Sequence, residues 1–591
     1  MALRIFPGLV PSAPRLRLVW TALSAPTLPI PFRFQPHTTR HNGGFEMKRA
    51  VRGLFLLAVL GASFAYAQIQ GVQNIIVVIQ ENRTPDNLFQ DQTLITAGAD
   101  IRPFATGGLC YNSTTKMDVA VPLIPRPLKD CVNPDHSHGQ GWNASYRSGN
   151  MDGACQNIHW GSCSPPPPTC PVGSGQTYCP QYAYVDNTGS TPIQPYWDIA
   201  EKYGFANYMF QTNQGPSFPA HQFLLSGTSA PDSINNPDYT YFAAENTPGM
   251  QDAGCAASTG QTVKLVDPNK VESASVYPCF EHPTLTDLFD NNLPNPVYWR
   301  WYSDQANSIW TAPNAISHIC NNSVQNGGGS CGSGTGSNDW NTDVAPYLER
   351  ATRPNYTPTS TLAPFLQDLQ NCYFPNSGST GGVYFVVPDG RWSDHPTQNF
   401  GLGPDYVANI VNLIGRTTAQ GGCASPRPNW NNTVVLITWD DWGGWYDHVS
   451  PNGPDGPGIG YSNNTGGQYV YGFRVPLLVV STFAKQHYIS GTIATPIKYD
   501  FGSILKFIEE NLLPSNTFIN PVYPYADQFV TTNVNDLSDF FDCSGPQCHP
   551  FQPITLVNNS QLCSQNICKS NQCDVACFIN YPGSPVNPDD E

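Results

Sequence analysis

The chain has 591 residues, of which only 12% are charged, whereas glycine and proline are abundant at 51 and 56 residues. Hydrophobic residues make up 40% and aromatic residues 12%, which is enough for a large core and excludes a disordered chain. The formal net charge of −16 excludes electrostatic attraction to nucleic acid, and it limits any membrane contact to a peripheral one.

The N-terminal region has the pattern of an export signal. Basic residues just after Met47 precede an apolar run, residues 53–66, and a small-x-small cleavage pattern ends at Ala67. We predict a signal peptide at residues 47–67, cleaved after Ala67, and a secreted or periplasmic mature protein. A membrane anchor is the alternative, but the run is shorter than the ~20 apolar residues that a span needs. Residues 1–46 are predicted to be an upstream extension or a mis-assigned start.

The cysteines support the same compartment. All 18 follow Ala67, and an even number in an exported chain predicts disulfides, although their pairing cannot be deduced from the sequence. Six cysteines crowd the last fifty residues, where no helix or strand period is visible. We therefore predict one large domain at residues 68–556 and a Cys-rich C-terminal appendage at residues 557–591. The mature chain retains 20 basic and 43 acidic residues, a net charge of −23.

Strand and helix patterns alternate along the proposed domain. Short apolar runs typical of strands buried on both faces occur at residues 74–80, 383–387, 433–438 and 475–480. Helical spacing occurs at residues 196–203, 405–414 and 503–511. This order predicts an α/β fold with three α/β/α layers and a mostly parallel central sheet, with ligands outside the carboxyl ends of the strands. The Gly- and Pro-rich stretches at residues 150–191 and 321–341 are expected to be long, disulfide-pinned loops.

Polar residues follow these strands where a site is expected. Glu81 and Asn82 end the first run and could bind a hard cation and a phosphate oxygen, although such residues are often only solvated. Asp440 and Asp441 follow the run at 433–438, and adjacent carboxylates repel each other unless a cation neutralises them. Ser217 follows a Gly-Pro turn at a predicted helix start. It is either a plain N-cap or a nucleophile whose position at a helix N-terminus favours attack on phosphate.

Four segments of the chain resemble the bacterial phosphoesterase family that contains acid phosphatases and phospholipases C. They are residues 76–89 (IVVIQENRTPDNLF), 440–449 (DDWGGWYDHV), 472–480 (GFRVPLLVV) and 500–509 (DFGSILKFIE). The resemblance covers roughly residues 72–555. It implies an alkaline-phosphatase-like fold in which a serine or threonine nucleophile lies next to a bound divalent cation.

Residue by residue, the resemblance implies that Glu81, Asp440 and Asp441 bind one divalent metal ion of unknown identity. It also implies that Asn82 contacts the substrate and that Ser217 is the nucleophile. The chain departs from many relatives in having Asp441 where they have glutamate, and in having His221 near Ser217.

The resemblance further implies catalytic histidines. His395 lies in a His-Pro motif, and two candidates upstream, His136 and His138, compete for a second position, of which we favour His136. His448 matches a motif position, with a structural role as the alternative.

The sequence thus predicts a secreted, metal-dependent phosphoesterase of the acid phosphatase type, with a phosphoseryl intermediate and a small-molecule or lipid phosphate ester as substrate. A phospholipase C that cleaves phosphodiester headgroups is the alternative. Trp392, Trp442 and Trp445 could then enclose a choline cation, although aromatic residues near a sheet are more often packing. A third possibility is a catalytically inactive secreted binding protein with the same fold.

Overall fold

The computed structural model describes most of the predicted catalytic domain. The described residues are 68–557 apart from 158, 162, 164–178, 189–192, 233–240, 268, 293–295, 325–326, 350–363, 376–380, 398–400, 461–468, 521–524, 531–533 and 546–547. The predicted extension, the signal peptide and nearly all of the appendage lie outside the described residues, so those assignments stay predictions.

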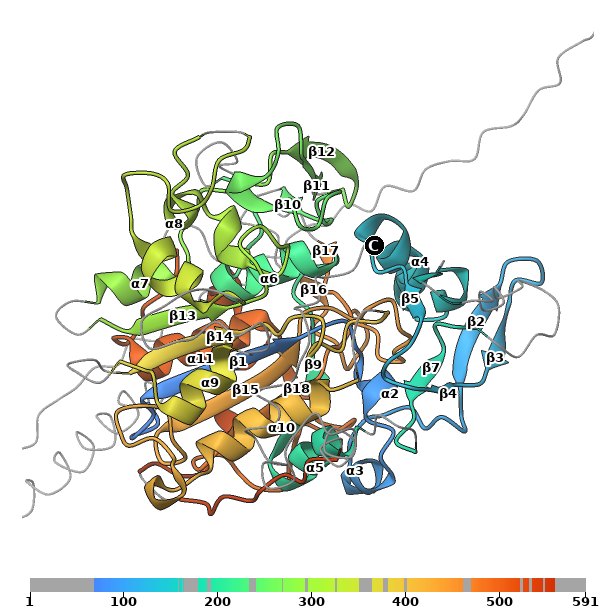
Figure 1. The fold of residues 1–591 in the computed structure, drawn as a ribbon. Helices are drawn as coiled ribbons and strands as arrows, with labels where there is room; N and C mark the ends of the chain where they lie inside the picture. Colours follow the sequence, from blue (N-terminus) through green and yellow to red (C-terminus); the bar gives the residue numbers. More distant parts are fainter. Residues whose placement is uncertain are drawn as a thin grey trace, which may run out of the picture. The chain divides into compact units, whose positions relative to one another are not determined.

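A seven-stranded sheet forms the centre of this region (Figure 1). Its strands are, in spatial order, β13 (Tyr298–Tyr302), β14 (Gly382–Val386), β1 (Asn74–Gln80), β15 (Thr433–Trp439), β18 (Leu477–Ser481), β8 (Gly204–Ala206) and β19 (Tyr488–Ser490). Every residue of β1, β14 and β15 is buried. Burial on both faces explains why these strands are continuous apolar runs rather than alternating ones.

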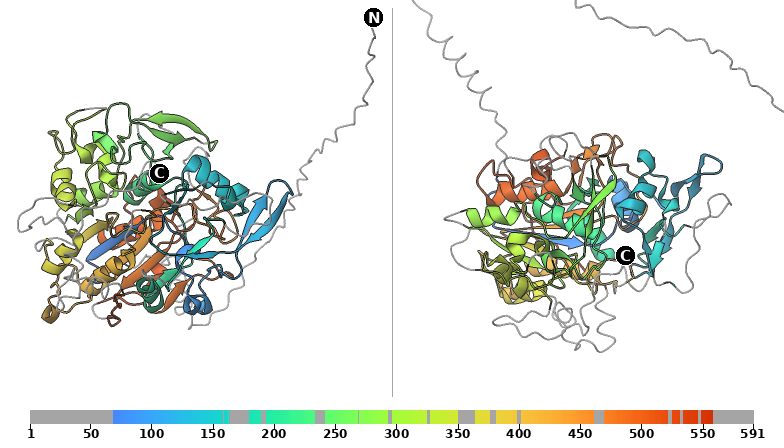
Figure 2. Two further views of the ribbon diagram at one scale, coloured as in Figure 1. Left: turned by 45° about the vertical axis from the view of Figure 1, so that its right-hand side comes forward. Right: turned by 90° about the horizontal axis from the view of Figure 1, so that it is seen from above.

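Helices cover both faces of the sheet. In the right-hand view of Figure 2, the orange-red α11 (Phe501–Leu512) lies on one side of the blue β1, and the yellow α9 (Pro364–Asn371) and α10 (Gly403–Ile414) lie on the other. α6 (Ser217–Ser226) packs against α11, and α5 (Gln194–Lys202) packs against α10. The predicted α/β fold with three layers is confirmed, and each predicted helix lies within two residues of an observed one.

Only one strand of the sheet runs against the others. β18 pairs antiparallel with both β15 and β8, whereas the remaining pairs are parallel. The run at residues 475–480 was expected to be a strand like the other three. In the structure its carboxyl end instead lies at the opposite edge of the sheet. The sequence does not reveal this direction, because a fully buried strand shows the same apolar pattern whichever way it runs.

Smaller elements surround the central layers. Within the described residues the minor strands are β2 (Gly108–Asn112), β3 (Met117–Val121), β4 (Ile124–Arg126), β5 (Val132–Pro134), β6 (His159–Gly161), β7 (Ala183–Val185), β9 (Tyr208–Met209), β10 (Phe242–Ala243), β11 (Val263–Val266), β12 (Glu272–Val276), β16 (Ile459–Gly460), β17 (Tyr469–Val470) and β20 (Lys498–Tyr499). The minor helices are α2 (Pro85–Leu88), α3 (Gln92–Ala97), α4 (Asn143–Tyr146), α7 (Leu285–Asn291), α8 (Ser317–Cys320) and α12 (Ala526–Phe529). Strands β10, β11 and β12 form a separate three-stranded sheet.

Disulfides tie the loops to one another, as the sequence predicted. The described pairs are Cys110–Cys155, Cys131–Cys163, Cys255–Cys279, Cys320–Cys331, Cys372–Cys423 and Cys543–Cys548. Three of these bridges have one cysteine within residues 150–191 or 321–341, the two loops that were predicted to be held by disulfides. Because Cys543 pairs with Cys548, neither of them connects the domain to the remaining tail cysteines.

Candidate active site

The two acidic motifs meet at the carboxyl edge of the sheet. β1 and β15 are neighbours, with Gln80 paired to Trp439, so Glu81 and Asp440 leave adjacent strands at the same level. The backbone N–H of Asn82 donates to Asp440 Oδ1 at 3.1 Å. Asn82 has a left-handed φ of 61°, and a Cβ at Gly443 would collide with its backbone. The turn after β15 therefore requires glycine at this point.

Ser217 lies between two carboxylates. It is the first residue of α6, it is fully buried, and its Oγ lies 3.3 Å from Glu81 Oε2 and 3.4 Å from Asp441 Oδ2. The hydroxyl has a single proton, so it can donate to only one of them at a time. The positive end of the helix dipole also favours negative charge on this oxygen.

His221 joins the same group from the next turn of α6. Its Nε2 lies 3.0 Å from Glu81 Oε1 and 3.7 Å from Asp440 Oδ2. Burial lowers the pKa of His221 to about 4, so the ring is neutral and has a lone pair available to a metal ion. The sequence analysis noted His221 only as a departure from relatives. Its spacing of four residues from Ser217, one helical turn, was the available signal.

The charges of the cluster fit a bound cation. Burial, together with the carboxylates of Asp440 and Asp441, raises the pKa of Glu81 well above its usual range. Asp440 Oδ2 and Asn82 Oδ1 are buried, with no hydrogen-bond partner among the described residues. Ligand atoms of Glu81, His221 and Asp440 lie within 4.8 Å of one another. Two carboxylates and an imidazole are a suitable ligand set for a divalent cation such as Zn²⁺ or Mn²⁺.

Two of the predicted histidines lie beside this cluster. His136 Nδ1 donates to Pro134 O at 2.9 Å, so His136 Nε2 accepts from Asn82 Nδ2 at 3.0 Å. His395 Nδ1 donates to Pro396 O at 2.9 Å. The centroids of the two imidazole rings are 6.2 Å apart. The structure therefore brings His136 and His395 together with Asn82.

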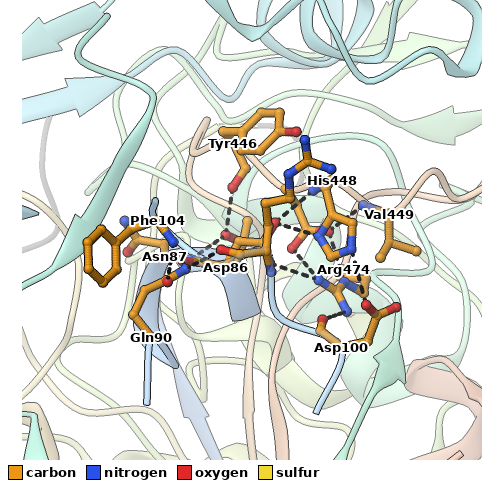
Figure 3. A network of polar contacts seen from close by, with 12 residues as sticks. Asp86, Asn87, Gln90, Asp100, Phe104, Tyr446, His448, Val449 and Arg474 are labelled. Atoms are coloured by element: carbon orange, nitrogen blue, oxygen red, sulfur yellow. Dashed lines mark hydrogen bonds and ion pairs between the residues drawn. The ribbon is translucent and has the colours of Figure 1, made fainter. Parts of the chain in front are cut away.

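His448 belongs to a different network, which Figure 3 shows. Its Nδ1 lies 2.7 Å from Asp86 Oδ2 and its Nε2 lies 3.2 Å from Asp100 Oδ1. Arg474 bonds to Asp447 at 2.8 Å and to Asp86 at 3.3 Å. Burial opposes the charge on His448, but Asp86 and Asp100 raise its pKa to about 10. Both ring nitrogens are occupied, so these contacts favour the structural alternative for His448.

The three tryptophans considered for a choline site are buried side chains. Trp392 stacks on Tyr406, and Trp445 lies under the guanidinium of Arg83 at 5.1 Å. The ring centroid of Trp442 lies 6.1 Å from that of His136. Packing explains Trp392 and Trp445.

The layered, mostly parallel sheet is consistent with an alkaline-phosphatase-like fold, and residues at its carboxyl edge could hold a metal ion. Residues 72–512 match the family described as the Phosphoesterase family, and the chain belongs to that family. The protein is therefore a hydrolase that acts on phosphate esters.

Curated relatives carry phospholipase names. Phospholipase C B of Mycobacterium tuberculosis is 23% identical over 530 residues, which cover 85% of this chain and 84% of that protein. The non-hemolytic phospholipase C of Burkholderia pseudomallei is 26% identical over 220 residues, 34% of this chain and 28% of that protein. The protein of the same name from Pseudomonas aeruginosa is 22% identical over 194 residues, 29% of this chain and 25% of that protein.

The disulfides and these relatives together indicate an extracellular or periplasmic protein. No helix within the described residues is both long and apolar enough to cross a membrane.

Proposed function

We propose that Ser217 is the nucleophile of a phosphate-ester hydrolase of the acid phosphatase type. The observation that carries this proposal is the position of Ser217 Oγ, at a helix N-terminus and within 3.4 Å of both Glu81 and Asp441. A serine hydroxyl that served only in packing would not require two buried carboxylates beside it, because burying carboxylates is costly.

Glu81, Asp440 and Asp441 would hold one divalent cation, with His221 as a further ligand and Asn82 beside it. When bound, the cation would supply positive charge that favours the serine alkoxide and offsets the charge of the phosphate. Asn82 would orient a phosphate oxygen, while its bond to His136 fixes the position of that ring.

The chain's own groups account for the proton transfers. Ser217 Oγ attacks the phosphorus in line, its proton passes to a neighbouring carboxylate, and the bond to the leaving alcohol breaks. His395 gives a proton to the leaving oxygen, or His136 does so when its Nε2 is protonated and no longer accepts from Asn82. Water then attacks the phosphorus from the opposite side and gives its proton to the histidine, the bond to Ser217 Oγ breaks, the carboxylate returns the proton to Ser217, and phosphate leaves. An acidic working pH suits this scheme because it keeps the histidine donor protonated.

A phospholipase C is the second candidate, favoured by the names of the relatives. It would use the same nucleophile and metal on a phosphodiester, with lipid contact at the membrane surface only. An inactive binding protein is less well supported, because such a protein would not need Ser217 and three carboxylates around one buried point.

Hydrolysis of p-nitrophenyl phosphate and of p-nitrophenyl phosphorylcholine, each with and without a chelator, separates these candidates. Ser217→Ala should abolish turnover with normal metal content, whereas the matched control Ser226→Ala, on the same helix, should be fully active. Ser226 is also buried, and its Oγ has no hydrogen-bond partner among the described residues. Retained turnover in a folded Ser217→Ala protein would refute the proposal.

The metal ligands can be tested separately. Asp440→Asn combined with Asp441→Asn should lose metal and activity together, because two anions balance the cation. Unchanged metal content by mass spectrometry would mean that other residues bind the ion.

A further inference from the structure

A pair of carboxyl groups lies beside the candidate site without being part of it. Glu245 lies two residues after β10 and Glu272 is the first residue of β12, and both strands belong to the three-stranded sheet (Figure 1). A carboxyl oxygen of each lies within 4.8 Å of the other and of a ring nitrogen of His138. Two carboxyl groups this close repel each other when both are ionised, and a proton on one of them removes that repulsion.

The pair holds the segment that carries His136. Gly139 N donates to Glu245 Oε1 at 2.9 Å, and His138 Nδ1 lies 3.0 Å from Glu272 Oε1. A Cβ at Gly139 would lie 2.8 Å from Glu272 Oε1, so the backbone rests directly on the carboxyl groups. These contacts begin two residues after His136.

The same strand end contacts the nucleophile helix. Asn246, next to Glu245, accepts from the backbone N–H of Phe218 at 2.8 Å. This N–H belongs to the first turn of α6, directly after Ser217. A Cβ at Gly215 would collide with Ala244 O, so the turn that leads into Ser217 also packs here. Residues 244–246 thus touch both sides of the site.

We propose that Glu245 is a positioning residue for the reaction: its carboxyl group accepts from Gly139 and, together with Glu272, holds the His136 segment against the start of the Ser217 helix. Glu245 bonds to Gly139 rather than to Ser217 or His136, so it acts through the segments that carry them. The proposal rests on the proposed roles of Ser217 and His136.

The state of the proton makes this contact depend on pH. Burial and the neighbouring Glu272 raise the pKa of Glu245 well above its usual range. Burial opposes the charge on Glu272, but hydrogen bonds from His138, Glu245 and Lys264 lower its pKa to about 2. Lys264 of β11 also faces the pair, and its Nζ lies 2.9 Å from Glu272 Oε2.

The direction of the pH dependence follows from the raised pKa of Glu245. The contact is intact in acid and is lost as the pH rises through the pKa of the folded protein, where two ionised carboxylates repel each other. Activity should therefore fall on the alkaline side even when the catalytic histidines are in the correct state.

Glu245→Gln is the sharpest test, because an amide keeps the acceptor for Gly139 without titrating. In the metal-loaded full chain, this variant should retain wild-type kcat for p-nitrophenyl phosphate at acidic pH and lose the alkaline decline. Glu245→Ala should lower kcat by about tenfold to a hundredfold at all pH values, with metal content unchanged. The exposed Glu281→Gln is the matched control and should keep the wild-type pH profile.

Hydrogen exchange of residues 137–146 provides a readout that does not need activity. Corrected for intrinsic exchange, the protection of this segment should fall with rising pH in the wild type and stay constant in Glu245→Gln. If the wild type hydrolyses neither substrate, the proposed function fails while this comparison still decides the role of Glu245. An identical pH profile and identical protection in wild type and Glu245→Gln would overturn the inference.

Discussion

Replacing His448 by glutamine tests whether this residue stabilises the fold or takes part in chemistry. The change removes a positive charge that contacts Asp86 at 2.7 Å and Asp100 at 3.2 Å, and leaves Arg474 as the cation of the network. A pKa that rises from 6.5 to about 10 corresponds to ~5 kcal/mol at 1.36 kcal/mol per unit. The side chain is 19% exposed and glutamine can still donate a hydrogen bond, so we expect a loss of ~2–4 kcal/mol near pH 6.

The pH dependence distinguishes this ion pair from ordinary packing. Because the pKa of His448 is raised in the folded protein, its contribution is complete below pH 6.5 and is lost as the pH rises through about 10. Urea unfolding should therefore separate wild type from His448→Gln widely at pH 6 and much less near pH 10. The exposed His487→Gln is the control and should change stability by less than ~0.5 kcal/mol. Unchanged stability at pH 6 with a large loss of kcat would refute the structural role.

Three further predictions concern the metal site and the chain ends. His221→Ala should weaken metal binding by about tenfold to a hundredfold, measured by metal titration, and unchanged affinity would remove His221 from the ligand set. Truncation after Val557 should preserve activity and melting temperature, whereas truncation after Pro553 should lower the melting temperature because Ile554 exchanges two hydrogen bonds with Asn412. Mass spectrometry of the secreted protein should find Gln68 as the first residue, and a start before Met47 would contradict the signal assignment.

The sequence predicted those parts of the site that follow from local patterns. The runs that became β1 and β15 are continuous Val and Ile stretches, because both faces of these strands are covered. Parallel strands end at one edge of a sheet, so Glu81 and Asp440 had to meet wherever these strands are neighbours. The Gly-Pro turn before Ser217 similarly predicted the observed helix start.

The remaining features depend on tertiary contacts. The direction of β18 cannot be read from its residues. Because both of its faces are buried, the strand lacks the alternation of apolar and polar residues that would show which neighbours surround it. His221 is a neighbour of Glu81 only because α6 packs beside the carboxyl end of β1. His448 follows the acidic pair by only seven residues, yet the chain turns at Gly443 and Gly444, both with positive φ, and carries it to Asp86 and Asp100.

The network around Arg474 explains how the acidic cluster can exist before a cation binds. Mutual repulsion of Glu81 and Asp440 tends to separate the segments that follow β1 and β15. These segments are joined again further along, where Arg474 bridges Asp86 of the first segment and Asp447 of the second. Separating buried charges that are paired in this way is costly. Each bond to Arg474 also leaves only a short stretch of unconstrained chain between the end of the strand and the bonded aspartate. The acids are therefore held in place by the fold itself, as the proposed metal site would require.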